Sequence, residues 1–560
     1  MQFGTFPLFY PCSLIAFRVA LSKVKCMTNG APSIHTTEGK LNELRRRMAE
    51  AYAPVGQDNI DKVHETGRKT ARERILALLD EGSFVETDAL AKSRSHAYEL
   101  AAFKPVGDGV VTGYGTVDGR SVCAFSADAT VMNGTFGEVT GEKIGKIIDL
   151  AIKTGRPLVT ILDGDGARLQ EGVNSLAHYG EIFRRLVQAS GLIPQISIVL
   201  GECSGGNAFI SALQDFVIMV KGQSHLLFGT PAKIAERAGD LSVEELGGAE
   251  TQVAETGICH YAATDEEDAI TYAKELLAFL PSNNRAEAPK TPAEKIQGAP
   301  GSHPFPRDLE LDSIIPDSDS ATYNMHDIVS RIVDENSFLE VQSGRADNIL
   351  TGFARVEGRS VGVVANQPQV KAGTLDKAAS EKAARFVRTC DAFNVPVITF
   401  VDVPGFLPSV DEELAGSVRS CAKLFYAYAE STVGKVTVVV RKAFGEAYNA
   451  MGSKHLGVDI NLAWPTAQIA IDDADNAVSV LYRKELAEAQ EKGEDVTALA
   501  QQFAAQYSEH VVNPYIAAER GFVDSVIAPS HTRDEIAIAL RLLERKVVPA
   551  YPKRHGNIPL

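Results

Sequence analysis

The chain has 560 residues, more than one hydrophobic core usually holds, so two domains with linkers are expected. Apolar residues make up 45% and charged residues 23% of the chain, which is typical of a globular protein, and the net charge of −16 argues against a nucleic-acid-binding protein. The 7 cysteines are scattered without a C-x-x-C pair, and no stretch approaches ~18 consecutive apolar residues. We therefore expect no disulfide framework, no cysteine zinc site and no transmembrane helix, and we predict a cytoplasmic protein because free cysteines fit a reducing compartment.

The first segment of the chain, residues 1–26, is apolar and aromatic and has no acidic residue. Its positive charges follow the apolar run instead of preceding it, so it resembles a signal peptide poorly. We expect an upstream extension, with Met27 as the natural start and residues 1–36 disordered. A mitochondrial transit peptide is the alternative interpretation. A helical pattern begins at Thr37.

Two distant parts of the chain resemble each other. The run DEGSFVE at 80–86 matches DENSFLE at 334–340, and the matches after it keep one offset: Gly113 corresponds to Gly352, which is 239 residues further (352 − 113). An apolar helix face repeats at the same offset, with members 144, 147, 148 and 151 in one copy and 383, 386, 387 and 390 in the other. Chance rarely keeps one offset over such a length, so the pattern indicates duplication of a whole domain.

Each of these helices precedes a β-branched run, PLVTILD at 157–163 and PVITFVD at 396–402, which opens into a glycine-bearing loop. Strand, helix, strand and loop in this order imply a parallel α/β unit. Between the copies, the segment 281–320 contains seven prolines and has the composition of a linker. We predict an N-terminal domain over 37–285, a linker over 286–320 and a C-terminal domain over 321–560.

A later strand in each copy leads into a candidate site. The strand at 195–201 runs into Gly205 and Gly206, and the strand at 435–440 runs into Gly445. Ligands in open α/β folds bind at the carboxyl ends of strands, and unpaired N–H groups at a helix N-terminus can form an oxyanion hole. The alternative is that Gly205 and Gly206 only allow tight packing of strand and helix.

Other chemistry is less well supported. Residues 201–205 fit G-x-C-x-G, a nucleophile elbow with Cys203 as nucleophile, but a hydrolase leaves the duplication unexplained, and a buried inert cysteine is favoured. Asp163 and Asp402 close strands, and they are either polar site residues or caps of the next turn. The chain has no P-loop and no H-E-x-x-H motif, and we expect it to hold no metal.

The chain resembles the carboxyltransferase (β) subunits of biotin-dependent acyl-CoA carboxylases, the propionyl-CoA and acetyl-CoA carboxylase group, and is most similar to actinobacterial members. The resemblance runs from about Thr37 to Leu560. It is densest in KAARFVRTCDAFNVPVITFVDVPGFLP (382–408), YAYAESTVGK (426–435) and MGSKHLGVDINLAWPTAQIAI (451–471).

The resemblance implies an α/β fold of two crotonase-like domains (N- and C-terminal halves), in which the N-terminal half binds acyl-CoA and the C-terminal half receives carboxybiotin from a separate biotinylated α subunit. Halves of two subunits would enclose each site in a homo- or hetero-hexamer, with or without a small accessory subunit. Three groups of site residues are implied. The catalytic backbone amides are those of Gly205, Gly206, Glu446 and Ala447; the substrate-binding residues are Gly164, Gly166, Ala167, Arg168, Tyr448 and Asn449; and Gly405, Phe406 and Gly445 lie on the biotin side.

The sequence departs from the family pattern at this site. Glu446 stands where the family has glycine; if the backbone there needs a positive φ, the strain would cost roughly 1–3 kcal/mol. Its carboxylate would also oppose developing negative charge. Asp472 and Asp473 replace Met-Gly, and Asp165 replaces a small residue. Two interpretations are open: a carboxyltransferase for an unusual acyl-CoA, or a diverged subunit that is weakly active or only structural in a mixed complex.

Overall fold

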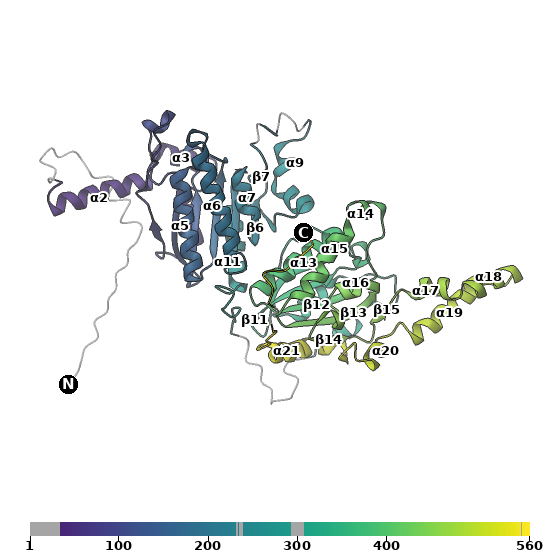
Figure 1. Cartoon of the computed structure of the whole chain (residues 1–560). Coiled ribbons are helices and arrows are strands. Elements are labelled where there is room, and N and C mark those ends of the chain that lie inside the picture. The colour runs from purple at the N-terminus through teal and green to yellow at the C-terminus, as the bar shows by residue number, and fades with distance from the viewer. Residues whose placement is uncertain (1–33, 231–232, 235–238, 293–306, 550–551, 560) are drawn as a thin grey trace, which may run out of the picture. The chain divides into compact units, whose positions relative to one another are not determined.

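The structure is a computed structural model that describes residues 34–230, 233–234, 239–292, 307–549 and 552–559 (Figure 1). Helix α2 (Thr37–Tyr52) belongs to a unit that ends at Ala53, and the rest of the chain forms a second compact unit. The Thr36 side chain caps α2 by accepting a hydrogen bond from the Gly39 N–H at 3.1 Å, which confirms the helix start expected at Thr37. The predictions for residues 1–33 lie outside the described residues.

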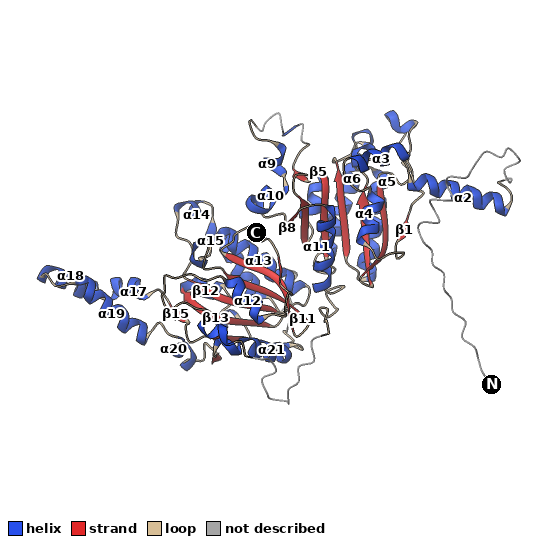
Figure 2. Ribbon diagram, turned by 180° about the vertical axis from the view of Figure 1, so that it is seen from behind, coloured by secondary structure: helices blue, strands red, loops and turns tan. Residues whose placement is uncertain are grey.

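Two eight-stranded sheets of the same topology make up the second unit (Figure 2). The first has the order β1-β2-β3-β4-β5-β6-β8, with β7 beside β5; the second has the order β9-β10-β11-β12-β13-β14-β16, with β15 beside β13. The first three strands of each sheet pair antiparallel, and the others pair parallel. The duplication predicted from the constant offset is thereby confirmed.

The strands of the N-terminal sheet are β1 Val85–Thr87, β2 Val110–Val117, β3 Arg120–Ala127, β4 Leu158–Gly164, β5 Gln195–Ser204, β6 Phe216–Val220, β7 His225–Leu227 and β8 Tyr261–Ala263. Those of the C-terminal sheet are β9 Leu339–Glu340, β10 Ile349–Val356, β11 Arg359–Asn366, β12 Val397–Val403, β13 Lys435–Phe444, β14 Ile460–Ala463, β15 Gln468–Ala470 and β16 Ser525–Val526. Strands β5 and β13 extend beyond their predicted ends because each takes a second partner, β7 or β15, for its last residues.

Helices cover both faces of the N-terminal sheet. Helices α5 (Glu138–Thr154) and α6 (Val173–Ala189) lie in front of it in Figure 1, and α4 (Ala71–Leu78) and α11 (Glu266–Phe279) lie in front of it when the molecule is seen from behind in Figure 2. The predicted apolar face of α5 is buried against the sheet, in a core cluster that also contains residues of α6. This arrangement leaves the carboxyl ends of β4 and β5 for loops.

The C-terminal sheet is covered in the same way. Helices α13 (Lys377–Ala392) and α15 (Ser417–Glu430) share one core cluster, and α12 (Met325–Ile332) and α21 (Thr532–Leu543) share another. The remaining α-helices of the described residues are α3 Gln57–Glu65, α7 Gly206–Ala212, α9 Val243–Gly247, α10 Ala249–Thr251, α14 Val410–Leu414, α16 Gly445–Ala450, α17 Ala474–Leu481, α18 Arg483–Lys492, α19 Val496–His510 and α20 Pro514–Glu519.

The two halves share packing. Phe279 of α11 stacks on Phe353 of β10, with ring centroids 5.9 Å apart, and one core cluster contains residues of both sheets. The described ends of the predicted linker also pack on the C-terminal half: Lys290 bridges to Arg359, and Leu311 is buried. The domain boundaries therefore stay a prediction.

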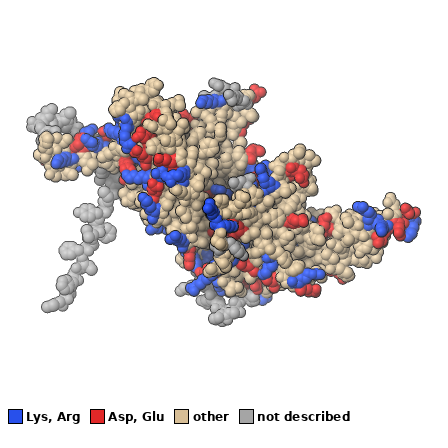
Figure 3. Space-filling view, in the orientation of Figure 1, with Lys and Arg blue, Asp and Glu red and all other residues tan. Residues whose placement is uncertain are grey.

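The surface carries charges of both signs. On the face in Figure 3, Lys and Arg side chains lie among Asp and Glu side chains. Arg94, for example, pairs with Glu138 at 2.8 Å and Glu142 at 2.6 Å. Among the described helices, none is long and apolar enough to span a membrane.

Candidate functional site

The first candidate site is the turn between β5 and α7. Gly205 has φ +58°, a conformation that side-chain-bearing residues rarely adopt, and its N–H donates to the carbonyl of Leu227 at 3.2 Å. Gly206 begins α7, and a Cβ on it would lie 2.5 Å from the Tyr179 ring. Within the described part of the chain, the Gly206 N–H forms no hydrogen bond. A free amide therefore remains at the end of a buried strand.

A glycine loop from β4 lies against this turn. A Cβ on Gly166 would be 3.3 Å from the Ser204 carbonyl and 3.9 Å from the Gly206 nitrogen. The Asn207 amide fixes the loop by donating to the carbonyls of Gly164 at 3.0 Å and Asp165 at 3.1 Å.

The Gly166 carbonyl accepts from the Phe136 N–H at 3.0 Å, and Phe136 also bridges to Ala167. The structure thus brings Gly164, Gly166 and Ala167 together with Gly205 and Gly206.

Arg168 is placed differently. Its side chain is fully buried and pairs with Asp108 at 2.8 Å and with Glu171 at 2.9 Å, and it donates to the Thr135 carbonyl at 3.0 Å. These contacts hold the loop in place, and the two carboxylates neutralise the charge of the guanidinium. Substrate binding by Arg168 stays a prediction, and the structure supports a role in shaping the loop.

The C-terminal half repeats the geometry. Gly445 at the end of β13 has φ +58°, the same value as Gly205. The Leu375 N–H donates to the Gly405 carbonyl at 3.0 Å, and the Leu407 N–H donates to the Leu375 carbonyl at 2.8 Å. Leu375 thus holds the loop that contains Phe406, as Phe136 holds the loop that contains Gly166. Within the described residues, the N–H groups of Glu446 and Ala447 form no hydrogen bond. The second turn therefore also presents free amides.

The expected backbone strain at Glu446 is absent. The positive φ falls on Gly445, and Glu446 is not among the non-glycine residues with positive φ. It lies in the first turn of α16, where L-residues fit, and its side chain is exposed. The condition for strain, a positive φ at Glu446, is not met, because the second position of the turn is already helical.

The two halves share a contact between the central strand and the helix before it. The first residue of each central strand donates to a carbonyl of the preceding helix: Gln195 to Leu186 at 3.2 Å, and Lys435 to Tyr428 at 2.6 Å. This link is thus part of the repeated unit, and Glu446 lies in a turn that already accommodates an exposed side chain.

The next residues of α16 differ in their contacts. The Tyr448 hydroxyl is buried without a hydrogen-bond partner in the described structure, and burial raises the pKa of Tyr448 to about 12. The Asn449 side chain accepts from the Ser453 hydroxyl at 2.7 Å. Both roles in substrate binding stay predictions.

The two aspartates that depart from the family pattern have a local structural role. Asp473 is the N-cap of α17 and accepts from the Asn476 N–H at 2.8 Å, and its own N–H donates to the Asp472 carboxylate at 2.9 Å. The segment nevertheless adjoins the site, since a Cβ on Gly445 would lie 3.3 Å from the Ile471 carbonyl.

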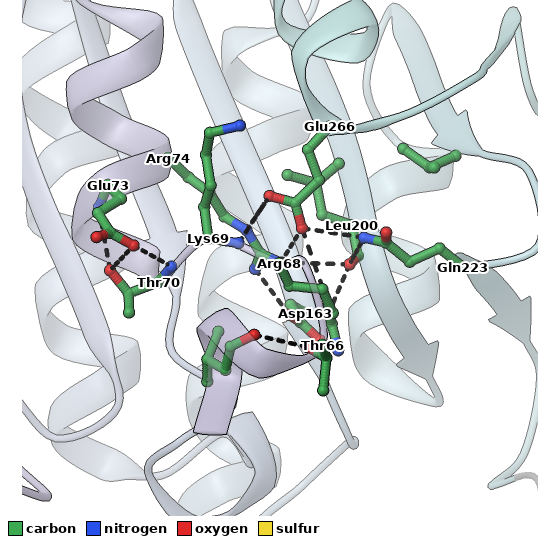
Figure 4. Close-up of polar contacts among 12 residues, drawn as sticks. Thr66, Arg68, Lys69, Thr70, Glu73, Arg74, Asp163, Leu200, Gln223 and Glu266 are labelled. Carbon is green, nitrogen blue, oxygen red and sulfur yellow. Dashed lines mark hydrogen bonds and ion pairs between the residues drawn. The ribbon is translucent and has the colours of Figure 1, made fainter. Parts of the chain in front are cut away.

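Asp163 and Asp402 are centres of buried ion-pair networks. Asp163 pairs with Arg68 and, at 2.7 Å, with Arg74, whose guanidinium also binds Glu266 at 2.6 Å (Figure 4). In the C-terminal half, Asp402 accepts hydrogen bonds from the Arg441 side chain at 3.1 Å, the Tyr323 hydroxyl at 2.7 Å and the Lys442 N–H at 3.0 Å. Sequence reasoning missed these partners, because they come from elements as far as 192 residues apart in the chain.

The hydrolase alternative does not fit the geometry. Cys203 lies within β5, is 1% exposed, and burial raises the pKa of its thiol to about 12. A nucleophile needs an accessible thiolate. Among the described residues, no group of three or more His, Cys, Asp and Glu side chains could hold a metal ion.

Comparison with known proteins identifies the family. The carboxyl transferase domain matches residues 62–558. The chain belongs to the carboxyl transferase domain family. It is 56% identical over 528 residues to the biotin-dependent acetyl-/propionyl-coenzyme A carboxylase beta5 subunit of Mycobacterium tuberculosis, with 94% of this chain and 96% of that protein covered. It is 57% identical over 534 residues to the propionyl-CoA carboxylase beta chain of Saccharopolyspora erythraea, with 95% and 97% covered.

A solved structure of this family has the same fold. The transcarboxylase 12S hexamer, determined with methylmalonyl-coenzyme A and methylmalonic acid bound, matches with a TM-score of 0.89 and 42% identity over 95% of this chain and 100% of that one. The predicted family and the predicted double crotonase-like α/β fold are confirmed.

Proposed function

We propose that this chain is the carboxyltransferase subunit of a biotin-dependent acetyl-/propionyl-CoA carboxylase, which moves a carboxyl group from carboxybiotin to the α-carbon of an acyl-CoA. The single observation that carries the proposal is the pair of glycine turns, Gly205-Gly206 and Gly445-Glu446, each with at least one free amide at the carboxyl end of a buried strand. Its relatives' names supply the substrate class.

In the N-terminal half, the chemistry required is stabilisation of an enolate. The free Gly206 N–H lies at the positive end of a helix, and a Cβ added to Gly166 of the neighbouring loop would lie 3.9 Å from its nitrogen. A thioester oxygen held there would receive a hydrogen bond that strengthens as negative charge develops. Loss of the α-proton of the acyl group is thereby favoured.

In the C-terminal half, the free amides of Glu446 and Ala447 suit the ureido oxygen of biotin. Negative charge grows on that oxygen when the N–CO₂ bond of carboxybiotin breaks, so donors there favour release of carbon dioxide. The enolate carbon then forms a bond to the carbon dioxide carbon, and the α-proton is taken up by the ureido nitrogen that has lost its carboxyl group. Each bond broken is matched by one formed.

The partners are those that this chemistry requires. We propose a biotinylated α subunit as the carboxyl donor, acyl-CoA as the acceptor, and a hexamer of carboxyltransferase chains like that of transcarboxylase 12S. A small accessory subunit and a mixed ring remain part of the proposal. A cytoplasmic location is supported by Cys123, Cys203, Cys259, Cys390 and Cys421, which are all free thiols.

One observation favours a second candidate, a diverged subunit with weak or no carboxyltransfer. Glu446, in the turn that would receive biotin, has an exposed carboxylate, and Asp472 directly follows Ile471, whose carbonyl would lie 3.3 Å from a Cβ on Gly445.

A reconstituted assay tests both candidates. The chain is combined with the biotinylated subunit of the same source, ATP, labelled bicarbonate and acyl-CoAs from acetyl to long-chain. Label fixed into propionyl- or acetyl-CoA supports the proposal. No fixation, restored by Glu446→Gly with Asp472→Met and Asp473→Gly, would support the diverged subunit.

A further inference from the structure

The central strand of each half contains a bulge just before its glycine turn. In the N-terminal half, Leu162 of β4 pairs with Val199 of β5, but Gly164 pairs with Cys203, so β5 advances four residues while β4 advances two. Strand β5 also changes partner there, from β6 up to Val199 to β7 from Glu202 onward. A bulge bends its strand and re-aims the residues beyond it, which here include Gly205.

The same bulge recurs in the C-terminal half. Val401 pairs with Val439, and Val403 pairs with Ala443, so β13 again advances four residues against two. Strand β13 also changes partner at this point, from β14 to β15. The bulge is thus part of the repeated unit and precedes both candidate half-sites.

A bulge leaves backbone carbonyls without ladder partners, and such buried groups are costly unless they are satisfied. In β5 the freed Leu200 carbonyl accepts from Arg68 at 2.7 Å, Gln223 at 2.8 Å and Arg74 at 3.4 Å (Figure 4). In β13 the corresponding Val440 carbonyl accepts from the Thr466 hydroxyl at 2.7 Å. The equivalent carbonyls of the two bulges therefore receive their hydrogen bonds from different kinds of side chain.

Each bulge is held by an aspartate that lies one residue before the end of the neighbouring strand. Asp163 is buried, binds both arginines that reach the Leu200 carbonyl, and lies so close to Gly201 that a Cβ there would overlap its carboxylate. Glu266 fixes Arg74 from the other side.

Asp402 is fully buried and accepts from the N–H of Lys442, a bulge residue, at 3.0 Å. It also accepts from the side chain of Arg441 at 3.1 Å and from the Tyr323 hydroxyl at 2.7 Å.

We infer that Asp163 and Asp402 are positioning residues of the two half-sites, each acting through the bulge that sets the place of the glycine turn after it. The inference rests on the proposed function for what each turn binds. Asp163 then governs the acyl-CoA side, and Asp402 governs the biotin side. A structural role alone would weaken both sides equally.

The experiment uses Asp163→Asn and Asp402→Asn in the intact complex. In the reverse transfer, free biotin accepts the carboxyl group of methylmalonyl-CoA, so each substrate has its own KM. Asp163→Asn should raise the KM for the CoA ester at least about fivefold and leave that for biotin within about twofold, and Asp402→Asn should do the opposite. Hydrogen exchange should rise about tenfold only in peptides that cover the affected bulge and the turn after it.

The matched controls bind the opposite ends of the two bulged strands, β5 and β13. Asp215 accepts from the Gln195 N–H at 2.9 Å at the start of β5, and Asp459 accepts from the Lys435 N–H at 2.9 Å at the start of β13. Asp215→Asn and Asp459→Asn should lower thermal stability without separating the two KM values.

A milder pair keeps the test decisive where an aspartate variant does not assemble. Gln223→Leu and Thr466→Val each remove the uncharged side-chain donor to a bulge carbonyl, and they should give the same split in smaller measure. Equal KM changes for both substrates, or unchanged exchange at the turns, would overturn the inference. If the wild-type protein showed no transfer activity, the proposed function would be refuted. The positioning role would still stand if the aspartate variants raised hydrogen exchange as expected.

Discussion

The contact between Gly206 and Tyr179 predicts that Gly206→Ala will impair the N-terminal half-site. The added Cβ would lie 2.5 Å from the ring, so the ring must move by about 1 Å to reach ordinary contact. It is stacked on Phe136 at a centroid distance of 4.1 Å, which blocks retreat in that direction. Overpacking of this kind costs roughly 1–3 kcal/mol of stability.

The displacement would also reach the glycine loop. The Tyr179 hydroxyl donates to Asn207 at 2.8 Å, and Asn207 holds the carbonyls of Gly164 and Asp165. A misplacement of about 1 Å at a reacting group can cost about a hundredfold in rate. We expect kcat for the acyl-CoA reaction to fall about a hundredfold. Both kcat in the reconstituted complex and the thermal unfolding midpoint would be measured for the variant.

The C-terminal half provides the matched control. Glu446→Ala keeps a Cβ at the corresponding position, where the wild-type structure already accommodates a side chain, so kcat should stay within about fivefold of wild type. Adding Gly206→Ala to Tyr179→Cys should cost less than adding it to wild type, because the obstructing ring is gone. The reasoning would be refuted if Gly206→Ala alone left both kcat and the unfolding midpoint unchanged.

Three further predictions address other parts of the molecule. Cys203→Ala should retain carboxyl transfer within about threefold, since the buried thiol takes no part, and loss of all activity would revive a thiol mechanism. Asp473→Ala should lower the stability of the α17 segment by about 1 kcal/mol, seen as faster hydrogen exchange there, whereas Asp473→Ser should not. Burial lowers the pKa of Lys143 and Lys382 to about 8; the unfolded chain keeps these protons to about pH 10.5, so the free energy of unfolding should gain a rising contribution between pH 8 and 10.5. Lys382→Met should flatten that rise, and an unchanged slope would contradict the assignment.

Much of the fold was predictable because the duplication leaves a constant offset in the sequence. The apolar faces of α5 and α13 and the strands after them depend on local periodicity, and the structure confirms them. The positive φ at Gly205 and Gly445 also agrees with the residue type.

The supporting network could not be predicted in the same way. Arg74 and Glu266 are 192 residues apart, and their contact depends on the packing of α4 and α11 against the same sheet. The bulge in β5 is a property of its register with β4, which no local pattern encodes. The sequence therefore marks Asp163 as a polar residue at a strand end without indicating its partners.

The remaining question is whether Glu446 is compatible with catalysis, and magnitudes decide it. Backbone strain is absent at this residue, so the charge or the bulk of its side chain is what could oppose the reaction. The carboxylate is exposed, and even at ~4 Å in bulk water two unit charges interact by only about 1 kcal/mol, or about fivefold in rate. Glu446→Gly should accordingly raise turnover by no more than about fivefold, and the gain should shrink as salt is increased from about 0.01 M to about 0.5 M because exposed charges are screened. A gain of about a hundredfold or more that is independent of salt would mean that the side chain blocks the turn physically, which is the condition under which the diverged-subunit interpretation would regain its support.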